Sequence, residues 1–253
     1  FAYQPKPVGA TYSMDRSNFV STRKTTGEIS EEERDERVHF RPSDISVGPD
    51  GALYVADWYD PGSGGHATRD ESSSGAIYRI APKDFKNKAL ELKLNKISGQ
   101  IDALLSPNPN VRFLGFQALQ KQGGKAYPSV LTLLSHSNPY VAARAIWLLP
   151  YLGEKGLNKT KELLRSDHAE FRLVAYRSLR RSGQELLPHA LELAKDPSAG
   201  VRRDVALSMR NFSARKAGPI LAEVSKRYDG IDKNYVEAIG LGSSGKEASV
   251  WKY

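Results

Sequence analysis

A period of 30 residues runs through the second half of the sequence and constrains its fold more than any other feature. Nine-residue blocks recur at this spacing, with apolar or small residues at their first, sixth and ninth positions. Such a period predicts a stack of helix-turn-helix units, each of which buries its apolar stripe only against its neighbours. The blocks are VRFLGFQAL from Val111, VAARAIWLL from Val141, FRLVAYRSL from Phe171, VRRDVALSM from Val201 and, more weakly, IDKNYVEAI from Ile231.

These blocks resemble the HEAT-like repeats, in the shorter variety of about 30 residues found in bilin-lyase-like proteins. The resemblance covers roughly residues 97–253 and implies an α-solenoid of about five helix pairs. The fifth block departs from the pattern, because Gly240, Gly242 and Gly245 interrupt its expected second helix. We expect there either a terminal cap or the point at which a longer protein was cut.

The sequence before residue 83 has the alternating apolar residues and the Gly, Pro and Asp punctuation of short strands. Residues 44–47, 52–58 and 76–80 are predicted strands, and residues 48–51 form the turn between the first two. Further upstream, residues 10–13 and 18–21 are predicted strands of a neighbouring unit. Three to five strands cannot close a barrel or cover both faces of a sheet, so this half is expected to be incomplete.

One run in this half, FRPSDISVGPDGALYVADWYDPGSGGH followed by GAIYRIAP, is distinctive. It resembles the last blade of a six-bladed β-propeller of the sorbosone/glucose dehydrogenase-like class, as in planctomycete-type proteins described as membrane-bound dehydrogenases. The matching motifs are Pro49–Tyr59, Gly65-His66 and Gly75–Ile80, with Ala76 where the family usually has Arg.

The expected fold class is therefore multidomain β plus α. A partial β-propeller, consisting of the last blade and part of a neighbour, would occupy residues 1–83. A linker would follow over 84–97, and a HEAT-like α-solenoid would occupy residues 98–253.

The propeller resemblance implies that the intact protein oxidises a sugar or an alcohol, with pyrroloquinoline quinone and Ca²⁺ as cofactors. It also implies a periplasmic, secreted or membrane-associated location, and electron transfer to a cytochrome c domain or another protein docked on the solenoid. No cysteine is present, so this chain has no c-type haem attachment site. Since the other blades would complete the site, we expect the chain alone to be inactive. The alternative is a non-catalytic scaffold that binds a protein or a polysaccharide.

The loop after the second predicted strand of the blade carries the candidate catalytic and metal-binding residues. His66 is a candidate general base or metal ligand, because its ordinary pKa lies near neutrality. The alternative is a loop histidine in contact with water or a neighbouring blade. Asp57 and Asp60 suit a hard cation such as Ca²⁺, or they form turn and strand caps.

The same region holds three candidate cofactor-binding residues. Trp58 and Tyr59 would stack on a sugar or a quinone ring, or else pack between blades as aromatic side chains often do. Arg41 precedes the first strand of the blade, where a cation would meet an anionic cofactor or form a surface salt bridge.

Charge and hydropathy exclude some classes of partner. The formal net charge is +8, but the 37 Lys and Arg residues are interleaved with 29 acidic ones. Without a concentrated basic face or a known module we expect no nucleic-acid binding. No apolar stretch is long enough for a membrane span. The predicted second helices are rich in arginine and would provide a surface for an acidic partner or a solvated face, through Arg172, Arg177, Arg180, Arg181, Arg202, Arg203 and Arg210.

Overall fold

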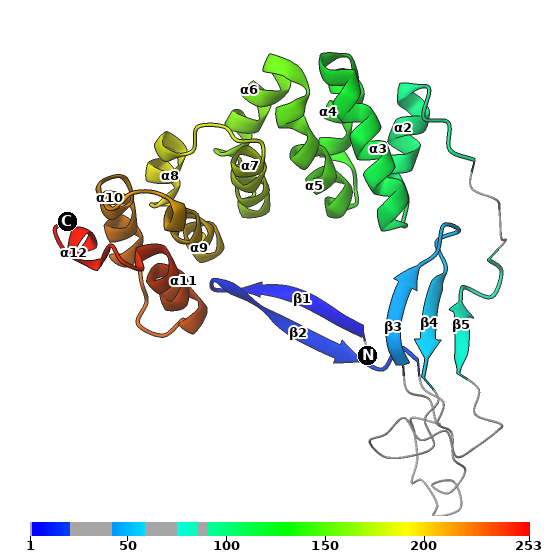
Figure 1. Ribbon diagram of the computed structural model, residues 1–253, viewed down its shortest axis with the longest axis horizontal. Coiled ribbons are helices and arrows are strands. Elements are labelled where there is room, and N and C mark those ends of the chain that lie inside the picture. The colour runs from blue at the N-terminus through cyan, green and yellow to red at the C-terminus, as the bar shows by residue number, and fades with distance from the viewer. Residues whose placement is uncertain (1, 21–41, 59–74, 86–90) are drawn as a thin grey trace, which may run out of the picture. The chain divides into compact units, whose positions relative to one another are not determined.

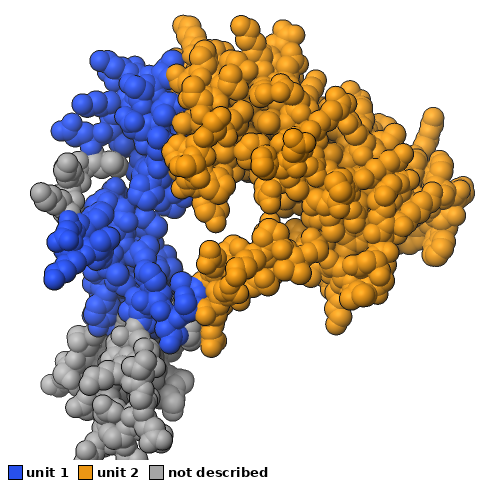
Figure 2. Space-filling view, turned by 180° about the vertical axis from the view of Figure 1, so that it is seen from behind, with its two compact units in different colours: residues 1–2, 17–117 blue, residues 3–16, 118–253 orange. Residues whose placement is uncertain are grey.

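The computed structural model describes residues 2–20, 42–58, 75–85 and 91–253. The chain divides into two compact units, which Figure 2 shows in different colours. The first consists of Phe1–Ala2 and Ser17–Gln117, and the second of Tyr3–Arg16 and Ala118–Tyr253. The predicted domain boundaries at residues 83 and 98 stay a prediction.

The first unit contains a three-stranded antiparallel sheet in the order β3-β4-β5 (Figure 1). The strands are β3 (Pro42–Val47), β4 (Leu53–Asp57) and β5 (Ala76–Ile80), which confirms the three predicted strands to within two residues. Val55 at the centre of β4 is buried and lies opposite Ile45 of β3. A propeller blade has four strands, so the propeller stays a prediction.

The turn between β3 and β4 has the conformation that its sequence predicts. Gly51 has a φ of +88°, a region that glycine adopts without strain. The backbone closes the turn because Gly48 N donates to Ala52 O at 2.8 Å. Asp50 accepts two hydrogen bonds from Arg79 of β5, at 2.6 and 3.0 Å, and these bonds hold the pKa of the carboxyl below its usual value. The turn therefore ties all three strands together.

The first unit also contains helix α2 (Ile97–Leu105) and the start of α3 (Pro109–Gln122). The two helices are in close backbone contact, since a Cβ added to Gly115 would lie only 2.5 Å from Leu104 N. Asn108 caps α3, with its Oδ1 accepting from Asn110 N at 2.8 Å, and its Nδ2 donates to Val47 O of β3 at 2.6 Å.

The second unit contains four further helix pairs followed by a short helix (Figure 1). The described helices thus form five consecutive pairs along the chain, as the 30-residue period predicts. The pairs are α4 with α5, α6 with α7, α8 with α9 and α10 with α11. The elements are η1 (Gly123–Ala126), α4 (Tyr127–Leu131), η2 (Thr132–Ser135), α5 (Pro139–Leu148), η3 (Leu149–Tyr151), α6 (Gly153–Leu163), α7 (Ala169–Arg181), α8 (Leu187–Leu193), α9 (Ala199–Ser208), η4 (Met209–Asn211), α10 (Ala214–Ser225), α11 (Lys233–Ser243) and α12 (Glu247–Val250).

The predicted apolar columns form the core of the second unit. Ile146, Leu149, Tyr176, Leu179 and Met209 come from these columns and are all buried. Each sits on the second helix of a pair or directly after it. Burial of such side chains contributes roughly 1.5–3 kcal/mol each relative to exposure, and this is the main term that holds the stack together.

A recurring arginine fastens the turn between the two helices of a pair. Arg172 Nη1 donates to the carbonyl oxygens of Ser166 and Asp167, at 2.7 and 3.2 Å. Arg202, 30 residues later, makes the equivalent pair of bonds to its own preceding turn at 2.6 and 3.0 Å. Arg112 does the same in the first unit. These arginines satisfy the carbonyl groups that a helix end leaves unpaired.

The fifth pair differs from the sequence prediction in its register. Its second helix, α11, is capped by Asp232, whose Oδ1 accepts from Tyr235 N at 3.1 Å. Ser198 caps α9 in the same way through Val201 N. Tyr235, rather than Ile231, therefore occupies the position equivalent to Val201. Ile231 lies before the helix and is 82% exposed, so its predicted place in the core was wrong.

The glycines of the fifth pair also behave differently from the prediction. Helix α11 runs without a break through Gly240 and Gly242. Gly242 is required by packing, because a Cβ there would collide with Ala206 O of α9. Close approach of two helix backbones outweighs the low helix propensity of glycine. The helix ends only before Gly245, which has a φ of +72°.

Two further strands, β1 (Ala2–Val8) and β2 (Thr11–Ser17), form a hairpin. Of the two strands predicted here, residues 10–13 overlap β2. Residues 18–20 are not in a strand, and Ser21 lies outside the described residues. Both strands are mainly exposed, so the alternation of residue types along them is not matched by burial of one face.

None of the helices in the described part of the chain has the length and apolar character needed to cross a membrane.

Candidate protein-binding site on the helical repeats

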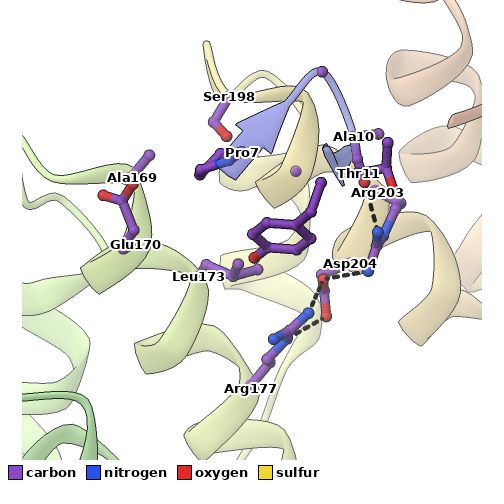
Figure 3. Close-up of a pocket in the computed structure, with 13 residues that line it drawn as sticks. Pro7, Ala10, Thr11, Ala169, Glu170, Leu173, Arg177, Ser198, Arg203 and Asp204 are labelled. Carbon is purple, nitrogen blue, oxygen red and sulfur yellow. Dashed lines mark hydrogen bonds and ion pairs between the residues drawn. The ribbon is translucent and has the colours of Figure 1, made fainter. Parts of the chain in front are cut away.

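The turn of the β1–β2 hairpin lies against α7, α9 and α11 in the second unit (Figure 3). Its two central residues are Gly9 and Ala10. Gly9 has a φ of +56°, as the first central position of a tight two-residue hairpin turn requires. Ala10 is only 2% exposed although it sits at the tip of an otherwise exposed hairpin. The helices therefore bury Ala10, whereas Gly9 stays exposed.

Two oppositely charged side chains bind the backbone of Ala10. Its N–H donates to Asp232 Oδ2 at 2.7 Å, and its carbonyl oxygen accepts from Arg203 Nη1 at 2.5 Å. Hydrogen bonds to charged groups are stronger than neutral ones. Both bonds are made to main-chain atoms of Ala10. They therefore depend on the backbone conformation of the turn and not on which side chain residue 10 carries. We call Arg203 and Asp232 the turn clamp.

Helix termini place both members of the turn clamp. Asp232 is the cap of α11, and it uses one carboxylate oxygen for that helix and the other for Ala10. Arg203 stands near the start of α9, close to Gly200. A Cβ on Gly200 would lie 4.0 Å from Gly9 O, an ordinary contact distance, so the turn lies directly beside this part of α9.

An ion pair next to Arg203 supports the turn clamp. Arg177 of α7 donates two hydrogen bonds to Asp204 of α9, each 2.7 Å long, and these bonds raise the pKa of the guanidinium. Arg203 Nη2 lies 3.9 Å from the same carboxylate (Figure 3). Asp204 thus holds both arginines in place. Arg203 Nε is buried and has no hydrogen-bond partner among the described residues, so the clamp retains one unused donor.

A small pocket of about 60 Å³ lies beside the turn and is lined by residues of the hairpin, α7 and α9. Pro7 and Leu173 give it apolar walls, whereas Glu170 and Arg177 give it charged ones (Figure 3). A buried water needs roughly 10–15 Å³, so the pocket has room for a few waters or one small side chain. Its volume is far below the roughly 300–1,000 Å³ that is usual for small-molecule sites.

A larger hollow of about 330 Å³ lies in the first unit. Its walls include Phe19, Val20, Ile45 and Val55, and Asp44 is the ionisable residue among the residues that line it. The oxygen Oδ1 of Asp44 accepts a hydrogen bond from the backbone N–H of Ile45. The described residues that line the hollow include no pair of acid and base groups for catalysis.

The predicted enzyme residues are only partly described. Asp57 is the last residue of β4 and is buried, while Trp58 follows it and is 55% exposed. The other four predicted site residues lie outside the described residues; they are Arg41, Tyr59, Asp60 and His66. In the described part of the chain, no three His, Asp or Glu side chains group in a way that would hold a metal ion. No reaction step follows from Asp57 and Trp58 alone.

Sequence reasoning missed the turn clamp. Arg177 and Arg203 belong to the arginine-rich second helices that the sequence singled out, but Asp232 and Ala10 were not candidates. A signal for Asp232 does exist, since an Asp three residues before a buried position is typical of a helix cap. Nothing local predicts its second bond, because Ala10 is 222 residues away in sequence.

Comparison with known proteins supports the helical part. A family model described as HEAT repeats matches residues 127–210, which span α4 to η4. The comparison with curated proteins gave no match. The fold and this match together indicate a helical-repeat array, and stacked repeats of this kind commonly create extended binding surfaces.

Substituting Gly9 with alanine is expected to release the hairpin turn from the helices. An alanine at a φ of +56° is strained by about 1–2 kcal/mol, and its Cβ would collide with the Asp232 carboxylate. Hydrogen exchange at the Ala10 amide should accelerate by about tenfold or more. The matched control is Gly230→Ala, which also has a positive φ but no neighbour within 4 Å. Unchanged exchange at Ala10 in the Gly9 variant would contradict the clamp.

Proposed function

We propose that this protein is a binding scaffold whose helical repeats hold the tight turn of a β-hairpin through its main chain. The observation that carries the proposal is the double recognition of Ala10, whose N–H and carbonyl group are bound by Asp232 and Arg203 from different helices. The chain's own hairpin supplies one such turn. An equivalent turn of a partner protein would fit the same clamp.

The chemistry of the clamp defines what it accepts. Gly9 must be able to adopt a positive φ, and Ala10 must be small because its side chain is buried. A Gly-Ala, Gly-Ser or Gly-Gly turn meets both conditions. The unused Nε of Arg203 would favour a ligand with one further acceptor.

A labelled peptide that copies residues 1–18 tests this proposal on the full chain. In the Ala10→Glu variant the chain's own turn no longer fits the buried position, so the clamp should be open to a peptide added in trans. We expect fluorescence anisotropy to show binding to this variant and at least about tenfold weaker binding to the wild-type chain, whose clamp is occupied. Circular dichroism checks that the variant retains its helices.

Two controls decide whether the clamp is responsible. Adding Arg203→Gln and Asp232→Asn to the Ala10→Glu chain should abolish peptide binding. The asparagine side chain keeps one oxygen for the α11 cap, but it presents an amide donor to the N–H of the turn in place of the second oxygen. A peptide that itself carries the Ala10→Glu change should not bind. Absence of binding to a folded Ala10→Glu chain would overturn the proposal.

Oxidation of a sugar or alcohol by the intact protein, with its quinone, Ca²⁺, cytochrome and periplasmic location, stays a prediction from the propeller resemblance. Four of the six residues predicted for it lie outside the described residues; they are His66, Asp60, Tyr59 and Arg41. The described contacts favour the scaffold function instead.

A further inference from the structure

Basic side chains collect where each second helix of the second unit ends and the next first helix begins. These side chains are exposed, and the connecting segments carry only two acidic residues between α5 and α10, Glu154 and Glu185. We call this set the basic edge. Its members are Lys155 at the start of α6, Arg180 and Arg181 at the end of α7, Arg210 in η4, and Arg215 and Lys216 at the start of α10.

The connections that carry these residues lie in one row. Stacked repeats place equivalent connections side by side, and several contacts agree with this. A Cβ on Gly124 would lie 3.7 Å from Leu152 O, which belongs to the next connection. Further along, Lys246 Nζ donates to Arg210 O at 3.0 Å, and Ser249 Oγ donates to Ala214 O at 2.9 Å. The row therefore continues towards α12.

The basic edge differs from the other arginines of the same helices. Arg172, Arg177 and Arg203 are engaged inside the molecule by carboxylates or carbonyl oxygens. By contrast, the six cations of the basic edge take part in no ion pair with the described residues. Aspartates such as Asp167 and Asp196 stand at the opposite ends of the helices, where they alternate with basic residues such as Lys195.

Helix stability accounts for only part of this arrangement. Arg180 and Arg181 lie in the last turn of α7, where a cation interacts favourably with the helix dipole. Lys155, Arg215 and Lys216 lie in first turns, where the dipole disfavours a cation. Three cations are thus placed against the local electrostatic preference, which points to a purpose outside the fold.

We propose that the basic edge binds an extended, acidic segment of a partner protein. Packed helices are about 8–10 Å apart, and an extended chain advances about 3.3 Å per residue. A carboxylate at every third residue would therefore meet successive connections. The cations lie in a single line of connections. A line of charge matches one extended polypeptide chain better than the broad surface of a membrane. Spaced carboxylates can also avoid Glu154 and Glu185, whereas the evenly charged backbone of a nucleic acid cannot.

A fluorescein-labelled (Gly-Ser-Glu)5 peptide tests the proposal by anisotropy with the full chain at low salt. The edge variant combines Arg180→Glu, Arg181→Glu, Arg210→Glu and Lys216→Glu. The control variant reverses four exposed lysines elsewhere in the second unit, through Lys161→Glu, Lys195→Glu, Lys226→Glu and Lys233→Glu. Both variants change the net charge equally. We expect the Kd to rise about tenfold or more in the edge variant and less than about threefold in the control, with affinity falling as salt is added.

Other outcomes overturn the proposal. Equal losses in the two variants would mean that only net charge matters. Tighter, edge-dependent binding of a 15-nucleotide oligo(dT), or of phosphatidylserine vesicles, would assign the edge to another class of partner. If circular dichroism shows that the edge variant is unfolded, Arg210→Ala with Lys216→Ala serves in its place. None of these variants changes the turn clamp, so the result tests the basic edge independently of the proposed binding of a hairpin turn.

Discussion

Replacing Asp196 with alanine is expected to lower the free energy of unfolding by about 3–5 kcal/mol. Asp196 accepts two hydrogen bonds from Arg172, at 2.7 and 2.8 Å, and a third from Ser198 N at 2.8 Å. The side chains of Asp196 and Arg172 are 2% and 11% exposed. Without the carboxylate, a buried guanidinium would lose its partner, and the turn before α9 would lose a bond.

Urea unfolding followed by circular dichroism measures this effect. Asp167→Ala is the control, because Asp167 occupies the preceding turn but is exposed, and we expect a change within about 0.5 kcal/mol. Adding Arg172→Met to Asp196→Ala should recover part of the loss, since an apolar side chain tolerates burial better than an unpaired charge. Equal effects of Asp196→Ala and Asp167→Ala would show that the pair does not link the third and fourth helix pairs of the array.

The helical array could be predicted because its information is local and repeated. A core column such as Leu149, Leu179 and Met209 recurs with the period of the fold, so each repeat supports the interpretation of the next. The strands of the three-stranded sheet were predicted for a similar reason. Their turn residues, Gly48 to Gly51, have one favoured conformation and mark both strand ends.

The fifth repeat shows where a periodic pattern misleads. Ile231 matches the pattern by residue type, but the cap at Asp232 sets the register of α11 and leaves Ile231 outside the helix. The loop before α11 is longer than its equivalents, and apolar spacing alone cannot detect this. From sequence, Gly242 was predicted to interrupt the helix, because glycine has a low helix propensity. Its close contact with the backbone of α9 is a tertiary feature that the sequence does not reveal.

The candidate site could not be predicted from sequence, for two physical reasons. The turn clamp joins Ala10 to Arg203 and Asp232, and such long-range contacts leave no local pattern. The strands of the hairpin are mainly exposed, so no buried face marks the turn as a point of contact. The enzyme residues predicted from family resemblance, such as His66, stay predictions, because they lie outside the described residues.

Replacing Tyr176 with alanine is expected to lower the free energy of unfolding by about 3–5 kcal/mol, as for other buried aromatic side chains. The ring of Tyr176 is 1% exposed, and its hydroxyl lies 2.7 Å from Ser208 Oγ of α9. Ser208 donates its own proton to Val205 O, so the tyrosine hydroxyl is the donor to Ser208. Burial raises the pKa of Tyr176, which keeps that donor protonated.

Three variants separate the ring from its hydroxyl. Tyr176→Phe keeps the packing and loses one hydrogen bond, so we expect a cost of about 1 kcal/mol. Tyr140→Ala removes a ring that is 67% exposed on α5, and its effect should stay within about 0.5 kcal/mol. If Tyr176→Phe destabilised the protein as much as Tyr176→Ala, the hydrogen bond would dominate instead of the packing. Because Tyr176 stands in the apolar column between neighbouring helix pairs, its loss should weaken the stack on both sides of α7.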